Sequence, residues 1–208
     1  MRRSKTVTDE AARVEFVPSD TAQPLPLAEM LPNPGPLEVD LGCGDGSFIA
    51  ALAAMHPERN YLGVERLLGR VRTACRKIAA QRLTNVRILR VDIAEAAATL
   101  IPPASVAVCH VMFPDPWPKR RHHVRRTVTA ELVRAISRIL VPGGLLRLTT
   151  DDQPYFVQMQ EAVAAVRAFE IADEESAPLL PRSEFESRFI DAGLPIHRLV
   201  LRNVSPSR

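Results

Sequence analysis

The chain has 208 residues, of which 46% are hydrophobic and 25% charged, and this balance excludes a largely disordered or fibrous protein. Its longest apolar run, Phe48 to Met55, is too short to span a membrane, and no hydrophobic stretch follows the basic N-terminus as in a signal peptide. Three widely separated cysteines, Cys43, Cys75 and Cys109, fit neither a disulfide framework nor a metal cluster. We therefore expect a cytoplasmic domain that has reduced thiols and no membrane association.

The formal net charge is only +3, but the charges are unevenly distributed along the chain. The segment Arg66 to Arg90 contains eight Lys or Arg residues and no acid, and Lys119 to Arg147 contains eight more against Glu131 alone. Clustered cations attract phosphates, so this segregation predicts a polyanion-binding face. Solvated helix faces are the alternative. We favour that alternative for Arg66–Arg90 but not for the denser run Lys119–Arg126.

Residues 1–36 form a compositionally distinct segment that holds six of the 18 prolines and ends in LPNPGP. Proline fixes the dihedral φ and removes a backbone donor, and this segment has no periodic apolar pattern. The sequence therefore predicts an extended or flexible Pro-rich arm over residues 1–36, followed by a single domain over residues 37–208.

From residue 37 onward, short apolar runs alternate with amphipathic stretches of helix length. The predicted strands are Leu37–Leu41, Tyr61–Val64, Val86–Val91, Val106–Phe113 and Leu145–Thr150. The predicted helices between them are Ser47–Met55, Leu68–Ala80 and Thr129–Leu140. This alternation predicts a doubly wound, Rossmann-like α/β fold, with a mostly parallel sheet and helices on both faces. A helix near Glu184–Ala192 and a last strand over Ile196–Leu201 complete the prediction.

A glycine-rich turn follows the first predicted strand in the segment LEVDLGCGDGSF. Gly42, Gly44 and Gly46 let the backbone approach a ligand closely and present free N–H groups. The spacing G-x-G-x-G differs from the dinucleotide fingerprint G-x-G-x-x-G, in which Ser47 would have to be the third glycine. A tight turn without a ligand is the alternative explanation for these glycines alone.

Acidic residues stand at the ends of three consecutive predicted strands. Asp40 precedes the glycine turn, Glu65 ends the second strand and Asp92 ends the third. Because the carboxyl ends of parallel strands line one crevice, the three acids together predict a nucleotide-type site, with Glu65 accepting both ribose hydroxyls. These elements resemble the S-adenosylmethionine-binding motifs of class I methyltransferases, in which the first acid could receive the methionine ammonium. A site for NAD remains the weaker alternative.

The fourth predicted strand leads into the segment HVMFPDPWPKRRHHVRR. Three prolines in five residues stiffen the chain and hold Asp115 and Trp117 over the crevice. The run Lys119–Arg126 then supplies five cations, which suit an enzyme that selects a base and grips the RNA backbone. We interpret His122 and His123 as surface residues, because no third metal ligand lies nearby.

The string FPDPWPKRRHH closely resembles the signature of the bacterial tRNA (guanine-N7-)-methyltransferases, the TrmB-type family. The likeness covers residues 37 to about 201. The segment LTTDDQPYFVQM is similar to the family's T-D-x-x-x-Y motif, which it matches at Thr150, Asp151 and Tyr155. The segment RSEFESRF is similar to T-x-F/Y-E, with Phe185 and Glu186 matching and Ser183 in place of Thr.

This resemblance implies S-adenosylmethionine as methyl donor, no metal, and tRNA as substrate. The implied cofactor-binding residues are Asp40, Gly42, Glu65, Asp92 and Asp115. Asp115 is also the implied catalytic residue, which would meet the target guanine. The implied tRNA-binding residues are Lys119, Asp151, Ser183 and Glu186. A helix capping box is a compatible explanation for Ser183 and Glu186.

The implied reaction transfers a methyl group to N7 of a guanosine in the tRNA variable loop. Guanine N7 carries an exposed lone pair, so no general base is needed and positioning supplies most of the acceleration. A class I methyltransferase for another RNA or a non-RNA substrate is the alternative, as is a binding module without catalysis. The retained acids favour an enzyme. We expect a monomer or homodimer with no obligatory protein partner.

Overall fold

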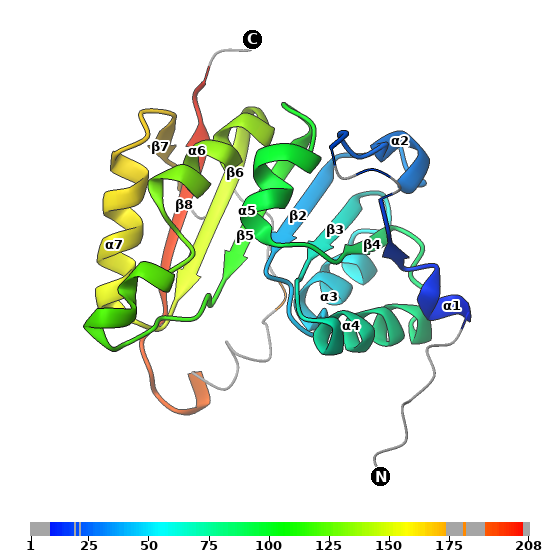
Figure 1. Cartoon of the computed structure of the whole chain (residues 1–208), viewed down its shortest axis with the longest axis horizontal. Coiled ribbons are helices and arrows are strands. Elements are labelled where there is room, and N and C mark those ends of the chain that lie inside the picture. The colour runs from blue at the N-terminus through cyan, green and yellow to red at the C-terminus, as the bar shows by residue number, and fades with distance from the viewer. Residues whose placement is uncertain (1–8, 19, 21, 174–180, 182–189, 206–208) are drawn as a thin grey trace.

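The computed structural model describes residues 9–18, 20, 22–173, 181 and 190–205. A sheet of eight strands forms its centre, in the order β1-β4-β3-β2-β5-β6-β8-β7 (Figure 1). The strands are β1 (Glu15–Phe16), β2 (Leu37–Leu41), β3 (Asn60–Val64), β4 (Val86–Leu89), β5 (Val106–Met112), β6 (Leu140–Thr150), β7 (Phe169–Ile171) and β8 (His197–Asn203). Strands β1 to β6 pair in parallel, whereas β8 is antiparallel to both β6 and β7.

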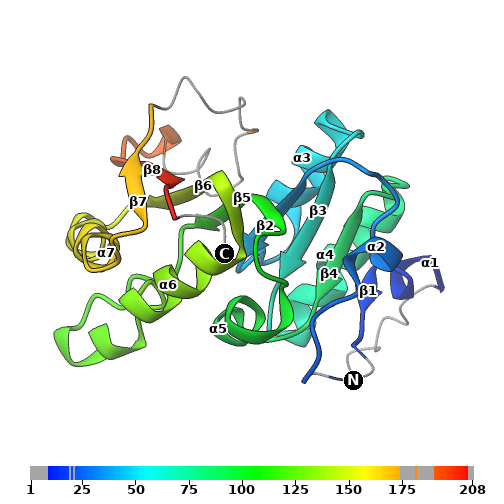
Figure 2. The ribbon, with the colours of Figure 1, turned by 90° about the horizontal axis from the view of Figure 1, so that it is seen from above.

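Helices cover both faces of this sheet (Figure 2). The α-helices are α1 (Asp9–Ala12), α2 (Leu27–Met30), α3 (Ser47–Met55), α4 (Leu68–Ala80), α5 (Ile93–Glu95), α6 (Ala130–Ile139) and α7 (Gln153–Ala164). A π-helical segment, η1 (Ala96–Leu100), continues α5, and a 3-10 helix, η2 (Arg120–Arg125), follows β5. This arrangement confirms the predicted doubly wound, Rossmann-like fold.

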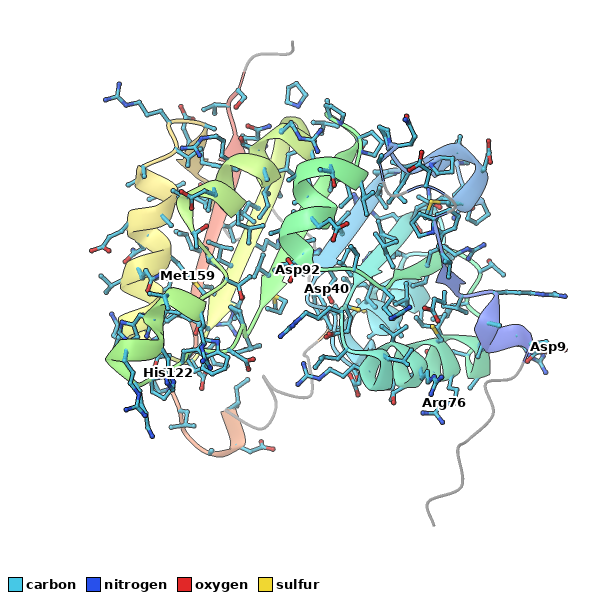
Figure 3. All side chains as sticks on the ribbon, viewed as in Figure 1. Asp9, Asp40, Arg76, Asp92, His122 and Met159 are labelled. Atoms are coloured by element: carbon cyan, nitrogen blue, oxygen red, sulfur yellow. The ribbon has the colours of Figure 1, made fainter. Side chains whose placement is uncertain are left out.

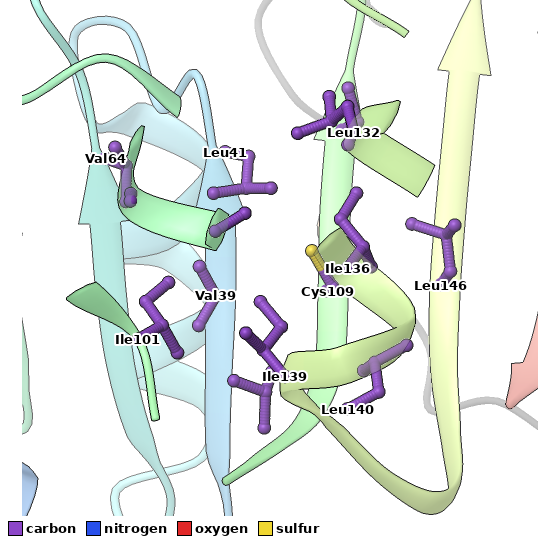
Figure 4. Packing of buried hydrophobic residues seen from close by; sticks show 14 of the residues in the cluster. Val39, Leu41, Val64, Ile101, Cys109, Leu132, Ile136, Ile139, Leu140 and Leu146 are labelled. Carbon is purple, nitrogen blue, oxygen red and sulfur yellow. The ribbon is translucent and has the colours of Figure 1, made fainter. Parts of the chain in front are cut away.

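The domain has two hydrophobic clusters, which lie on opposite faces of the sheet. Leu37, Val39 and Leu41 belong to one cluster with residues of η1, α6 and α7. Figure 4 shows part of this cluster, including Val39, Leu41 and Ile139 of α6. A second cluster joins α1, α3 and α4 to the other face of the sheet. Burial of each large aliphatic side chain contributes about 1.5–3 kcal/mol, so these clusters hold the sheet rigid beneath its carboxyl edge.

A buried polar network lies within the sheet around Glu38, two residues before Asp40 on β2. Glu38 accepts a hydrogen bond from His110 Nε2 at 2.9 Å and pairs with Arg59 Nε at 3.0 Å. Although burial raises the pKa of Glu38, the His110 hydrogen bond and the nearby cations lower it overall. Burial lowers the pKa of His110. The rings of His110 and of Phe48 in α3 pack edge to face, with their centroids 5.3 Å apart. The network therefore links β2, β5 and α3 directly behind the crevice.

The N-terminal arm differs from the extended or flexible segment that its prolines predicted. Its described part contains α1, β1 and α2, and β1 adds a parallel strand to the β4 edge of the sheet. Ala11, Leu25 and Met30 are buried against the domain. These elements are two to four residues long, too short to produce a periodic pattern, so composition alone was misleading.

The predicted element boundaries hold closely over the first half of the domain and less well afterwards. The first strand and the helices Ser47–Met55 and Leu68–Ala80 match the structure residue for residue. Strand β6 begins at Leu140 rather than Leu145, but its pairing with β5 passes from Val106–Leu140 to Val108–Leu145, so residues 141–144 form an irregularity in the ladder. Sequence analysis missed α7 and β7. The helix predicted near Glu184–Ala192 lies mostly outside the described residues.

Within the described ranges, none of the helices is both long enough and apolar enough to cross a membrane.

Candidate functional site

The acidic residues Asp40, Glu65 and Asp92 come together at the carboxyl ends of neighbouring strands β2, β3 and β4, as the sequence predicted. The chain leaves β2 toward β3 on one side of the sheet, while β5 lies on the other side. Such a reversal of strand order opens a crevice at the carboxyl ends of the strands. Figure 3 places Asp40 and Asp92 in the middle of the molecule, above the lower edge where His122 lies.

Asp40 is the most perturbed acid of this crevice. Its side chain is 3% exposed, and Oδ1 has no hydrogen-bond partner among the described residues. Burial, and then the negative charge of Glu65, raise the pKa of Asp40 to about 7. A carboxylate placed in this way is stabilised by a cation that enters the crevice.

Glu65 is also buried, but the chain holds its carboxylate in a fixed orientation. Oε1 accepts a hydrogen bond from the backbone N–H of Leu67 at 2.8 Å, and Oε2 lies 3.7 Å from Arg70. Asp92 is instead exposed at the rim, where it caps α5 by accepting from the N–H of Ala94 at 2.9 Å. The two acids thus present oxygens at different depths of one crevice.

The glycine turn needs its glycines for two different reasons. Gly42 has φ +94°, and a Cβ there would meet nothing within 4 Å, so this side of the turn is open. Gly46 has φ +75°, and its Cβ would lie 2.7 Å from that of Ala74, so α4 packs directly on the turn. The N–H groups of Gly42 and Cys43 donate to Val64 O and attach the turn to β3.

A side-chain cluster that sequence analysis missed braces the same turn. Lys77 of α4 pairs with Asp45 at 2.8 Å and donates to Ser47. Burial raises the pKa of Asp45, but the hydrogen bonds from Lys77 and Ser47 lower it overall. The unbroken basic pattern of α4 concealed this pairing, because the acid comes from a different element.

The loop that carries Asp115 connects β5 to η2. Asp115 is exposed and Trp117 is half-buried. The Trp117 and His122 rings pack edge to face with centroids 5.8 Å apart, and the guanidinium carbon of Arg125 lies 5.0 Å from the centroid of the Trp117 ring. Phe113 and Trp117 have φ of +48° and +46°, a region that large side chains rarely adopt. The prolines between them and contacts with the surrounding structure therefore hold the loop in one conformation.

The basic run does not behave as a uniform set of five cations. Lys119, Arg121 and Arg125 are exposed, whereas the side chain of Arg126 is 2% exposed. Arg126 donates from Nε to Pro116 O at 2.7 Å and from Nη1 to Gln158 Oε1 at 2.9 Å. The expectation of five phosphate-binding charges is therefore wrong for Arg126, because the chain itself satisfies its guanidinium.

The remaining predicted tRNA-binding residues fall into two groups. Asp151 is half-buried just after β6. Its neighbour Asp152 interacts at 3.5 Å with Arg126, which bonds Pro116 of the Asp115 loop, so Asp151 lies on the side of the sheet edge that carries this loop. Tyr155 of the same motif is fully buried, and its hydroxyl accepts from the N–H of Val128. Ser183 and Glu186 lie outside the described residues.

A hollow of about 650 Å³ lies away from this crevice, between α6, η1 and the end of β8. Its lining includes Ala104 before β5 and Leu140 at the start of β6, so it opens at the amino ends of the strands. The acids lie at the opposite edge of the sheet, and the hollow is not part of the candidate site.

The fold is the Rossmann-like α/β fold of class I methyltransferases. The chain superposes on TrmN from Thermus thermophilus with a TM-score of 0.60 at 19% identity, covering 82% of this chain and 45% of that one. An antibiotic-related methyltransferase aligns over 90% of this chain and 94% of its own, with a TM-score of 0.59 at 17% identity. These likenesses concern the fold alone.

Sequence comparison identifies the family. The model of the family described as "Putative methyltransferase" matches residues 34–199. Proteins named tRNA (guanine-N(7)-)-methyltransferase are 40% identical in Treponema pallidum, 37% in Thiobacillus denitrificans and 33% in Paracidovorax citrulli. The matches cover 80%, 81% and 98% of this chain, and 66%, 75% and 85% of those proteins. The chain therefore belongs to the tRNA (guanine-N7-)-methyltransferase family.

Proposed function

We propose that the protein transfers a methyl group from S-adenosylmethionine to N7 of a guanosine in the variable loop of tRNA. The observation that carries this proposal is the buried Asp40 carboxyl, whose Oδ1 has no partner in the described part of the chain. It stands in one crevice with Glu65 and Asp92, beside the loop that carries Asp115. The family membership of the chain supports the same reaction.

The residues of the crevice fit S-adenosylmethionine part by part. Asp40 would pair with the ammonium of the methionine moiety, and this pairing would supply the cation that its buried oxygen lacks. Glu65, held by the Leu67 N–H, would accept the two ribose hydroxyls. Asp92 at the rim would accept from the adenine amino group. The open side of Gly42 leaves room for the methionine chain against the backbone.

When bound, S-adenosylmethionine supplies an activated methyl group on its sulfonium. The chain then has to orient the guanine so that N7 lies in line with the methyl–sulfur bond. Asp115 would accept the N–H groups of the guanine edge and stabilise the positive charge that develops on the purine. Because N7 needs no deprotonation, no residue is required as a general base.

The RNA would approach along the loop and η2. Lys119, with Arg121 and Arg125, presents exposed cations to the phosphates that flank the target guanosine. Asp151 lies close to the same loop, and we place it, with Ser183 and Glu186, among the tRNA contacts that family resemblance implies. Side chains cannot read the deep major groove of A-form RNA, so the target has to be unpaired or flexible, as in a variable loop.

Methylation of an unmodified tRNA transcript with labelled S-adenosylmethionine tests the proposal directly. We expect label on N7 of one variable-loop guanosine, located by nuclease digestion and mass spectrometry. The matched control is the same transcript with adenosine at that position, which should accept no label. Label on a different nucleotide would contradict the substrate assignment and favour a methyltransferase for another RNA site.

We further infer that the enzyme works in the cytoplasm, without a metal, as a monomer or homodimer that needs no other protein. Full activity of the purified chain in the presence of a chelator would support the inference that neither a metal nor another protein is needed. Light scattering at working concentration distinguishes the monomer from the dimer.

A further inference from the structure

Arg126 ends the basic run Lys119–Arg126, but its side chain is buried and connects the Asp115 loop to α7. We call this set of contacts the tie. The guanidinium has three polar partners: Pro116 O at 2.7 Å, Gln158 Oε1 at 2.9 Å and Asp152 Oδ1 at 3.5 Å. It also lies over the ring of Tyr155, 4.7 Å from the centroid. A guanidinium engaged on its edges and one face, in a side chain 2% exposed, has no surface left for a phosphate.

One side of this tie is anchored at the start of α7. Asp152 caps α7 by accepting the N–H of Tyr155 at 2.7 Å, and its own N–H donates to Thr150 Oγ1 at 3.2 Å. The buried hydroxyl of Tyr155 accepts from the N–H of Val128 at 3.0 Å, which fixes the chain just after Arg126. Two of the groups around the guanidinium, Asp152 and Tyr155, are thus themselves held by hydrogen bonds to the backbone.

The other side of the tie is the loop that carries Asp115. The carbonyl that accepts from Arg126 belongs to Pro116, the residue directly after Asp115. Phe113 and Trp117, on either side of it, have positive φ, and such backbone conformations persist only where surrounding contacts impose them. Arg126 connects this stretch of loop to α7, since it donates to both Pro116 O and Gln158 Oε1.

We propose that Arg126 is the positioning residue of the Asp115 loop and does not bind RNA. It fixes the carbonyl after Asp115 to the rigid start of α7 and thereby sets where the carboxylate stands relative to the crevice. Lysine cannot replace it, because one ammonium cannot form the fork to three acceptors and stack on Tyr155. The proposal rests on the proposed function for the catalytic meaning of Asp115, but the tie itself can be tested without substrate.

The single tryptophan of the sequence, Trp117, lies in this loop and reports on it. In Arg126→Lys and Arg126→Gln we expect Trp117 to become more accessible to acrylamide, with lower fluorescence anisotropy, at temperatures where far-UV circular dichroism shows a folded protein. Turnover at saturating tRNA should fall at least tenfold, while KM for tRNA and its salt dependence stay within twofold of wild type.

Lys119→Gln is the matched control, since it removes an exposed cation from the same run. It should raise KM for tRNA and lower the salt slope without changing the quenching of Trp117. If Arg126→Lys gave the Lys119→Gln pattern, Arg126 would be a phosphate contact and the proposal would be overturned. Unchanged quenching and turnover in folded Arg126 variants would overturn it as well.

A milder variant covers the case in which Arg126 substitutions prevent folding. Gln158→Met removes one acceptor of the guanidinium from the half-buried face of α7 and should shift Trp117 quenching in the same direction by a smaller amount. No shift in this variant would count against the tie. If wild-type protein failed to methylate tRNA but the quenching results held, the proposed function would fail and the tie would stand.

Discussion

At the scale of single residues, Asp40 shows how a ligand site can oppose stability. Its pKa is about 7 in the folded chain, against 3.8 for an ordinary aspartate, because of burial and the charge of Glu65. Between these values the folded state holds a proton that the unfolded state has released. Stability therefore decreases as pH rises through this window, and the decrease is complete above pH 7.

Replacing Asp40 with Asn should therefore stabilise the free protein at pH 8 and not at pH 4. The shift corresponds to an upper limit of about 4 kcal/mol, and an amide without its own partners reduces the gain to about 1–2 kcal/mol. Thermal unfolding at both pH values measures the difference. Asp92→Asn, at an exposed position, should retain the wild-type pH dependence; an equal gain at both pH values for Asp40→Asn would contradict the argument.

The same carboxyl should make cofactor binding depend on pH. Only ionised Asp40 attracts the methionine ammonium, so affinity for S-adenosylmethionine should rise about tenfold per pH unit below 7 and level off above it. Calorimetric titration between pH 5.5 and 8.5 checks this profile. In Asp40→Asn the affinity should be low and flat across the range. A wild-type profile that is equally flat would exclude Asp40 as the partner of the ammonium.

At the scale of elements, the two basic segments of the sequence have different surroundings. Several cations of Arg66–Arg90 meet acids from other elements, as Lys77 meets Asp45 and Arg90 meets Glu15. The exposed members of Lys119–Arg126 lie instead on η2 or, in the case of Lys119, directly before it, next to the Asp115 loop. This difference supports the interpretation of the first segment as a solvated helix face and of the second as the RNA-binding surface.

Removing two cations from η2 and its flank should accordingly change the salt dependence of tRNA binding. For Lys119→Ala with Arg121→Ala, the slope of log affinity against log salt should fall by about 0.7–0.9 per lost phosphate contact. Arg72→Ala with Arg82→Ala removes two exposed cations of the other segment and should leave the slope unchanged. The assignment fails if both pairs lower the slope equally.

Which elements the sequence could predict follows from their length and burial. Strands β2 and β3 are buried along their whole length, and α4 and α6 are long and one-sided, so composition and periodicity marked them. The acids of the crevice were predictable because each stands at or shortly after the end of a strand: Asp40 within β2, Glu65 directly after β3 and Asp92 three residues after β4. The roles of Arg126 and Lys77 were not, because their partners Gln158 and Asp45 are about thirty residues away along the chain.

At the scale of the whole molecule, the acidic crevice and the basic surface beside the Asp115 loop lie at the same edge of the sheet. The crevice acids come from the ends of strands β2, β3 and β4, whereas the Asp115 loop and the exposed cations lie between β5 and the end of η2. Asp115 stands on the loop between these two halves. Because it is exposed and contributes no described hydrogen bond or ion pair to the fold, its replacement separates chemistry from folding and from RNA binding.

We expect Asp115→Asn to reduce turnover about a hundredfold or more while tRNA affinity and thermal stability stay near wild type. The substitution keeps the shape but replaces an acceptor with an amide donor, so a guanine N–H group would lose its partner and the developing positive charge its counter-charge. Single-turnover methylation at saturating tRNA and cofactor is the right measurement, since it excludes product release. Asp115→Glu is the matched control: it restores the charge at a longer reach and should recover part of the rate. A rate for Asp115→Asn within threefold of wild type, about 0.7 kcal/mol, would mean that Asp115 shapes the loop without acting on the guanine.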